Sequence, residues 1–244
     1  MGLDYTRNAI AQHLSAKKIR TYCSKYSPSP HHILDIGCGN GHETLALASQ
    51  YLNASITAID INPDRIKEAI RDHSKPKIHY HCQSLQDHTK GNIKYDSIVS
   101  NAALHWIPEI NQLPSLLDTH GHLIFSYYTN ETFKDLQDIL SIYYGNPVTL
   151  SAQQFKPFSE IKDLLSQELA LIESSKEIIT LEFDTMIDLL RHIRNTGTKG
   201  HPTLPNNAPW TAKMIKNIEA LYIKKYGKIR LTYDIIISVW KHQA

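Results

Sequence analysis

Three glycines at alternate positions, Gly37, Gly39 and Gly41, follow an apolar segment and precede a helical pattern in the stretch "HHILDIGCGNGHETLALA". Glycine allows a tight turn there and lets backbone N–H groups approach a ligand, beside the partial positive charge of a helix amino end. The spacing is G-x-G-x-G, whereas the dinucleotide fingerprint is G-x-G-x-x-G with a pyrophosphate at the helix. We expect a nucleotide-like ligand that is not a dinucleotide; the alternative is a tight turn that binds nothing.

Two aspartates accompany these glycines. Asp35 lies two residues before Gly37, where a negative charge favours a cationic group over a phosphate. Asp60 ends the next apolar segment, about 20 residues beyond the glycines, where acids of open parallel sheets accept hydrogen bonds from ribose hydroxyls. A ligand with a cationic end, a ribose and no phosphate is S-adenosylmethionine, and the residues predict this cofactor.

The elements that must position these residues alternate between short apolar strands and helices, which is typical of parallel βαβ units. The strands are predicted at Ile33–Ile36, Ile56–Asp60, Ile78–His81, Tyr95–Ser100 and His122–Tyr127. The helices between them are predicted at His42–Gln50, Pro63–His73 and Glu109–Asp118, and Asn62-Pro63 is a helix start signal. The glycines and Asp60 therefore follow the carboxyl ends of strands, where open parallel sheets bind ligands.

The second half of the chain breaks this alternation with successive helices. One helix is predicted to present Phe133, Leu136, Leu140 and Tyr143 on one face, and a shorter one, capped by Ser159, carries Ile161, Leu164 and Leu165. The remaining predictions are a strand at Ile178–Phe183, helices at Thr185–Arg194 and Thr211–Tyr226, and a final strand at Leu231–Trp240. Because no flexible linker intervenes, we expect one domain over residues 1–244, with an N-terminal helix or lid at 1–25 and helical cap insertions at 130–175 and 195–226.

Composition excludes several classes of protein. The chain has 244 residues, 41% hydrophobic and 20% charged, and no apolar run approaches the roughly 20 residues of a membrane helix. With no visible signal peptide and only Cys23, Cys38 and Cys82, we expect a cytoplasmic protein without a disulfide framework. The 26 basic and 24 acidic side chains give a net charge of +2, which does not indicate a nucleic-acid partner, although the segment after Thr185 is basic.

The histidines and Cys38 are weaker candidates for chemistry. The "HYHC" at residues 79–82 matches no zinc spacing and has no second ligand pair, so no metal site is expected. Cys38, at a helix amino end, could be a reactive thiol, but a small residue packed beneath the cofactor is the preferred interpretation.

Three segments resemble a known family. "ILDIGCGNG", "AIDI" and "YDSIVSNAALHWI" resemble the first, second and fourth motifs of the class I S-adenosylmethionine-dependent methyltransferases, over roughly residues 30–128. The resemblance implies a Rossmann-like α/β fold with a seven-stranded sheet, its last strand antiparallel, and a helical cap. It implies cofactor contacts from Asp35, Gly37, Gly39, Gly41, Asp60, Ile61, Gln83, Ser84 and Asn101. Where many members have an aspartate for adenine after strand three, this chain has His81, Cys82 or Gln83.

The second half has a resemblance of its own. "LLRHIRNTGTKG", "WTAKMIKNIEALY" and "KIRLTYDIIISVW" resemble the malonyl-acyl carrier protein O-methyltransferases of biotin synthesis, and "SNAALHWI" places His105 at the position of their glutamine, beside Trp106. This implies O-methylation of the free carboxylate of a malonyl thioester on carrier protein or coenzyme A. Guanidinium forks suit carboxylates, so Arg191 and Arg194 are candidate catalytic residues. The other two candidates are His105, at the glutamine position, and Tyr5, in an N-terminal helix that often closes over the cofactor in related enzymes. The basic last quarter could receive an acidic carrier protein, or its lysines could be solvated surface.

The expected reaction needs no general base, because a carboxylate is already ionised at neutral pH and the enzyme has only to align the reactants and exclude water. The absence of a catalytic dyad from the sequence agrees with this. Two alternatives remain: methylation of another small carboxylate such as trans-aconitate, and a non-catalytic S-adenosylmethionine-binding module. We expect a monomer with no nucleic-acid or membrane partner.

Overall fold

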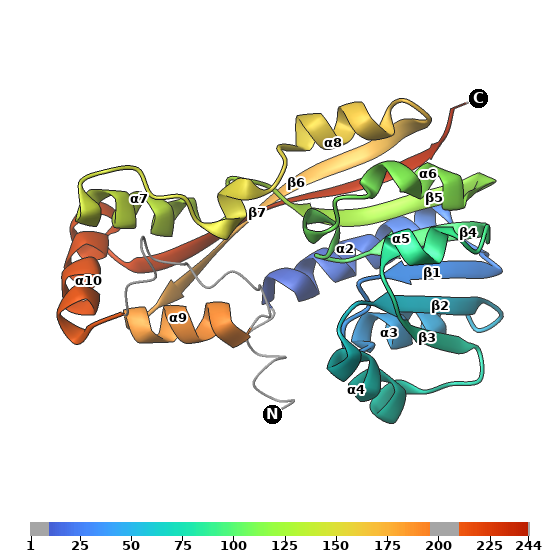
Figure 1. Ribbon diagram of the computed structural model, residues 1–244, viewed down its shortest axis with the longest axis horizontal. Helices are drawn as coiled ribbons and strands as arrows, with labels where there is room; N and C mark the ends of the chain where they lie inside the picture. Colours follow the sequence, from blue (N-terminus) through green and yellow to red (C-terminus); the bar gives the residue numbers. More distant parts are fainter. Residues whose placement is uncertain (1–9, 196–209, 244) are drawn as a thin grey trace. The chain divides into compact units, whose positions relative to one another are not determined.

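The computed structural model describes residues 10–195 and 210–243 (Figure 1), and these divide into two compact units. The sheet unit comprises Leu14–Tyr127, Pro157–Ser175 and the chain from Ile236 on. The cap unit comprises Tyr128–Lys156, Lys176–Ile235 and the start of the chain up to His13, as far as these are described. Three strands, β5, β6 and β7, contribute residues to both units.

Seven strands form one sheet in the order β3-β2-β1-β4-β5-β7-β6. Their bounds are β1 His32–Ile36, β2 Ser55–Asp60, β3 Ile78–Cys82, β4 Tyr95–Ser100, β5 Leu117–Tyr128, β6 Leu169–Phe183 and β7 Ile229–His242. The pairs among β1 to β5 are parallel, and the last strand is antiparallel. The order reverses between β1 and β4, and ligands of open α/β sheets bind at the carboxyl ends of strands at such a point. The predicted fold class is confirmed.

Helices and turns connect these strands. The sheet unit contains α3 His42–Gln50, α4 Pro63–His73, α5 Leu85–Thr89, η1 Leu104–Trp106, η2 Ile110–Gln112, α6 Leu113–Leu116, α8 Phe158–Leu165 and most of α2 Ile10–Tyr26. The cap unit contains α7 Lys134–Tyr144, η3 Ser151–Gln154, α9 Met186–Asn195 and α10 Ala212–Tyr226. In the described part of the chain, no helix combines the length and apolarity needed to cross a bilayer.

The predicted start of α4 is confirmed in detail. The Asn62 side chain accepts hydrogen bonds from the backbone N–H groups of Asp64 and Arg65, at 3.0 and 3.3 Å, and Pro63 occupies the first helical position. Proline suits that position because its missing N–H would have no partner inside the helix. This cap fixes the point at which the chain leaves the end of β2, immediately after Asp60.

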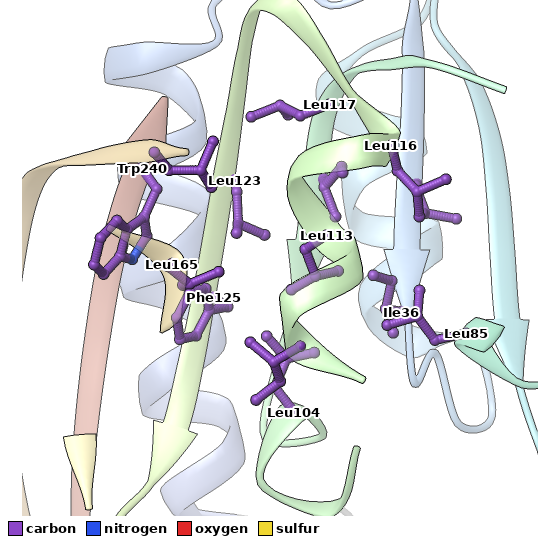
Figure 2. Packing of buried hydrophobic residues seen from close by; sticks show 14 of the residues in the cluster. Ile36, Leu85, Leu104, Leu113, Leu116, Leu117, Leu123, Phe125, Leu165 and Trp240 are labelled. Carbon is purple, nitrogen blue, oxygen red and sulfur yellow. The ribbon is translucent and has the colours of Figure 1, made fainter. Parts of the chain in front are cut away.

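The sheet unit has a continuous apolar core on one face of the sheet. Figure 2 shows Phe125 of β5 and Trp240 of β7 with side chains of η1 and α6, among them Leu104 and Leu113, and these residues are at most 1% exposed. The Trp240 indole N–H donates to Ser238 Oγ at 2.9 Å, so its polar atom is satisfied within the core. The same cluster includes Ile36, the last residue of β1, and Ile98 of β4.

Several sequence predictions are wrong at element bounds. The helix at Glu109–Asp118 is replaced by η2, the four-residue α6 and the start of β5, because Leu117 already pairs with Tyr95 of β4. Ser159 does not cap α8; it lies within the first turn, and Pro157 precedes the helix with its carbonyl accepting from Glu160 N–H at 3.0 Å.

Two more errors concern the start of α7 and the start of β6. Phe133 precedes α7 in a left-handed conformation, φ +66°, so it does not belong to the helical face that Leu136 and Leu140 bury. β6 begins at Leu169 and not at Ile178. From Ile172 on, its positions alternate between exposed and half-buried, and an edge strand tolerates polar residues at both.

Candidate active site

The turn between β1 and α3 holds the three glycines in the left-handed region, with φ of +71°, +56° and +83° at Gly37, Gly39 and Gly41. The backbone N–H groups of Gly37 and Cys38 both donate to the Ile59 carbonyl, at 2.8 and 3.1 Å. β2 therefore fixes the turn, and these two amides are not available to a ligand. Cys38 is buried, which raises the pKa of its thiol above the ordinary value and agrees with a packing role.

The three glycines are required for different reasons. A Cβ at Gly37 would lie 2.2 Å from Ala103 Cβ, and one at Gly41 would lie 2.6 Å from Tyr80 Oη. A Cβ at Gly39 would meet no atom of the described residues within 4 Å. Close packing of the protein thus explains two glycines, whereas Gly39 borders open space that a side chain would fill. An S-adenosylmethionine cofactor lying along the turn fits this space.

Asp60 connects the glycine turn to the end of β2. Its Oδ2 accepts from Gly39 N–H at 3.0 Å and its Oδ1 accepts from Asn62 N–H at 2.8 Å. A carboxylate has about four acceptor positions, so the half-buried Asp60 retains capacity for ribose hydroxyls. The neighbouring Ile61 is 73% exposed, so its side chain is free to cover a flat ring. Both residues suit their predicted roles.

Asp35 is the buried charge of the site. Its Oδ2 accepts from Thr44 Oγ1 at 2.6 Å, and only 3% of the residue is exposed. Burial raises the pKa of Asp35 to about 7, while the hydrogen bond from Thr44 opposes the rise. A cation nearby would restore the ionised form, so the environment favours a positively charged ligand. Thr44 was not predicted as a site residue, although its position two residues after His42 puts it in the first turn of α3.

At the end of β3, two predicted cofactor residues have protein partners. Gln83 Nε2 lies 2.5 Å from His88 Nδ1, and His88 Nε2 lies 2.8 Å from Tyr95 Oη. Ser84 caps α5 by accepting from Asp87 N–H at 3.0 Å. The exposed side chains here are His81 and Cys82. Within the described ranges, no three histidine, cysteine or acidic side chains are grouped so that they could hold a metal.

Asn101, after β4, is tied to two other elements. Its Oδ1 accepts from Ser15 Oγ of α2 at 2.7 Å and from Ser126 Oγ of β5 at 2.8 Å. Ser126 Oγ in turn accepts from the N–H of Ala102, a non-glycine residue with φ +53°. Strained backbone of this kind persists only where the surroundings hold it, and it occurs often at functional sites. The network positions Ala103 against Gly37.

His105 follows in η1 and is buried, with 8% of its surface exposed. Burial lowers the pKa of His105 to about 3, so the imidazole is neutral at neutral pH. Its ring meets Tyr127 edge-on at 6.0 Å, and Trp106 beside it is 42% exposed. His105 can therefore supply a neutral hydrogen-bonding group, and it supplies no positive charge.

The two arginines lie on α9 in the cap unit. Both are exposed, and Arg191 Nη1 donates to Asp188 Oδ1 at 2.6 Å, a pairing that their i, i+3 spacing could have predicted. No ion pair involves Arg194 among the residues whose structure is described. Between them His192 turns inward, and its Nε2 lies 2.8 Å from Tyr233 Oη. Tyr5, the remaining catalytic candidate, lies outside the described residues.

The chain matches known proteins both in sequence and in fold. Residues 33–121 match a family model described as a methyltransferase domain. The fold resembles the YcgJ protein of Bacillus subtilis, with TM-score 0.60 and 14% identity over 95% of this chain and 100% of the other. It also resembles the N-methyltransferase NodS of Bradyrhizobium japonicum bound to S-adenosylhomocysteine, with TM-score 0.52 and 14% identity over 94% and 86%. These findings identify a methyltransferase domain whose cofactor is S-adenosylmethionine.

The chain also resembles curated proteins whose names state a substrate. One is malonyl-acyl-carrier-protein O-methyltransferase 1 of Ilyobacter polytropus, 26% identical over 230 residues, which are 91% of this chain and 83% of that protein. Another is the malonyl-acyl-carrier-protein O-methyltransferase of Acetivibrio thermocellus, 28% identical over 222 residues, 84% of this chain and 77% of that protein. The similarity therefore extends well beyond the matched domain.

Proposed function

We propose that this protein methylates the free carboxylate of a malonyl group carried as a thioester on acyl carrier protein or coenzyme A. The observation that carries the proposal is the similarity to the two malonyl-acyl-carrier-protein O-methyltransferases named above. The similarity extends over 91% and 84% of the chain and so includes much of the cap unit. The product would be a methyl ester, and its formation would be an early step of biotin synthesis.

The residues of the sheet unit suit such a transfer. When bound, S-adenosylmethionine supplies a methyl group on a positively charged sulfur, which an ionised carboxylate can accept without a base. Asp35 would balance the positive charge of the cofactor, and Asp60 with the turn at Gly39 would hold its ribose. The neutral His105 could orient an oxygen by a hydrogen bond without taking up a proton. The task of the protein is therefore alignment and exclusion of water.

Arg194 is the better candidate for holding the carboxylate. Asp188 already occupies part of the guanidinium of Arg191, whereas among the described residues Arg194 has no ion-pair partner. A guanidinium offers two parallel N–H groups to a carboxylate, a geometry that lysine cannot reproduce. We infer that Arg194 binds the malonyl carboxylate and that Arg191 contributes less.

Transfer of labelled methyl from S-adenosylmethionine tests the acceptor, with malonyl-carrier protein, malonyl-coenzyme A, unloaded carrier protein and trans-aconitate compared side by side. We expect label only on the two malonyl thioesters. Label on trans-aconitate alone would overturn the malonyl proposal in favour of another small carboxylate. Tight binding of S-adenosylhomocysteine without transfer to any acceptor would favour a binding module.

Three arginine variants test how the carboxylate is held. Arg194→Ala should raise KM for both malonyl thioesters by about tenfold, the effect of losing one charged hydrogen-bonded pair. Arg191→Ala should have a smaller effect. Arg71→Ala is the matched control, since Arg71 is an exposed arginine paired with a neighbouring aspartate, Asp72, in the sheet unit. Equal KM values for Arg194→Ala and Arg71→Ala would exclude the role of Arg194.

A further inference from the structure

The outer face of α10 carries lysines without acids. Lys213, Lys216 and Lys224 are exposed, and Ala220 and Ile223, also exposed, lie among them. At 3.6 residues per turn these five positions share an arc of roughly 100°. We call this surface the lysine face; Ile223, which is 54% exposed, gives it an apolar contact point.

The acid of α10 and the lysines nearby that form ion pairs have their partners on other elements, outside this face. Glu219, the single acid of α10, accepts from Met186 N–H of α9 at 2.8 Å. Lys225 donates to Asp138 of α7 at 2.8 Å, and Lys228 pairs with Glu182. Residues 196–209, which precede α10 in the chain, include Lys199 and no aspartate or glutamate.

The lysines of this face are not ion-paired as they are on an ordinary solvated helix surface. Glu219 lies three residues after Lys216, but its carboxylate accepts from Met186 N–H instead. Solvated helices commonly carry acids three or four residues from their lysines, which stabilises the helix by about 0.2–0.5 kcal/mol per pair. Elsewhere this chain follows that pattern, as at Lys90 with Asp87 and Lys134 with Glu131. In the parts of the chain that are described, Lys213, Lys216 and Lys224 have no ion-pair partner.

We propose that the lysine face is the docking surface for an acidic helical protein surface, that of the carrier protein of the proposed reaction; the inference rests on that proposed function. Lys213 and Lys224 are eleven residues apart, roughly 16 Å along the helix, a span that matches about three turns of an acidic partner helix. Complementary charge accelerates encounter and fixes the orientation of partners, while Ile223, beside Lys224, provides an apolar contact.

Charge reversal tests this proposal. In the variant K213E/K216E/K224E, KM for malonyl-carrier protein should rise roughly tenfold or more at low ionic strength, since three attractions become repulsions. KM for malonyl-pantetheine, which has no carrier protein and no phosphate, should not change, and neither should kcat. The matched control is K75E/K162E/K241E, an equal change of charge at exposed lysines of the sheet unit.

A direct titration of each variant with malonyl-carrier protein separates this inference from the proposed function. Binding that weakens only in K213E/K216E/K224E supports the docking surface, whether or not methyl transfer follows. Equal binding and equal KM in both triple variants would overturn it. Absence of methyl transfer by the wild type would overturn the proposed function alone. Unchanged affinity for S-adenosylhomocysteine and an unchanged circular dichroism spectrum would establish that the variant is folded.

Discussion

Replacing Gly39 by alanine tests whether the cofactor occupies the open space beside the turn. The backbone φ of +56° costs alanine about 1 kcal/mol, which lowers Tm by roughly 2–4 °C in a chain of this size. No described atom lies within 4 Å of the new methyl group, so no steric cost within the protein adds to this strain. The methyl group would, however, project into the space assigned to the cofactor. We expect affinity for S-adenosylhomocysteine to fall by about tenfold or more, equivalent to at least 1.4 kcal/mol.

Gly37→Ala should behave differently because the protein itself opposes it. The added Cβ would lie 2.2 Å from Ala103 Cβ, whereas carbon atoms in contact normally lie about 3.5–4.0 Å apart. Overpacking of this kind costs about 1–3 kcal/mol in addition to the backbone strain at φ +71°. The total of roughly 2–5 kcal/mol predicts a fall in Tm of about 4–20 °C.

Gly145→Ala is the matched control. Gly145 ends α7 in the cap unit with φ +72°, and its Cβ would also meet no described atom within 4 Å. It should therefore lower Tm as much as Gly39→Ala and leave cofactor affinity unchanged. Thermal unfolding and calorimetric titration with S-adenosylhomocysteine measure both effects. If Gly39→Ala binds the ligand as tightly as Gly145→Ala does, the cofactor does not lie beside Gly39 and the reasoning is refuted.

Three further predictions concern buried or ligand-binding charges. Affinity for S-adenosylmethionine should rise between pH 6 and pH 8, because the cation favours ionised Asp35, whose pKa burial raises to about 7; titrations of Asp35→Asn should show no such rise. Burial lowers the pKa of His192 from 6.5 to about 4, so its stabilising contribution is present above pH 6.5 and is lost as pH falls towards 4. Between pH 7 and pH 5 the unfolding free energy should fall by about 2 kcal/mol from this group, and His192→Gln should remove that part of the pH dependence of Tm. Asp60→Asn should weaken S-adenosylhomocysteine binding about tenfold through loss of a charged acceptor, while Asp64→Asn, at an exposed position, should bind as the wild type does.

The sequence alone determined the elements that depend on local signals. The helices at His42–Gln50 and Pro63–His73 have the predicted bounds, because glycine, proline and an asparagine cap act within one turn of the chain. Alternation of strands and helices was also sufficient to predict the parallel arrangement of β1 to β5 and the edge at which Gly39 and Asp60 meet.

The start of β5 was not predictable in this way. β5 begins five residues before the predicted His122, because Leu117 pairs with Tyr95, and such pairing joins residues distant in sequence. The same cause replaced most of the helix expected at Glu109–Asp118. A helical pattern shows only what a segment could form alone, and a sheet edge nearby can override it.

The tertiary structure alone decided how each candidate residue is used. Gly37 and Gly41 look alike in sequence to Gly39, yet contacts from Ala103 and Tyr80 explain the first two and leave only the third beside open space. Gln83 and Ser84, predicted to bind the cofactor, have partners within the protein. The residue types and their spacing indicated the chemistry, whereas burial and distant neighbours determined which atoms remain available to carry it out.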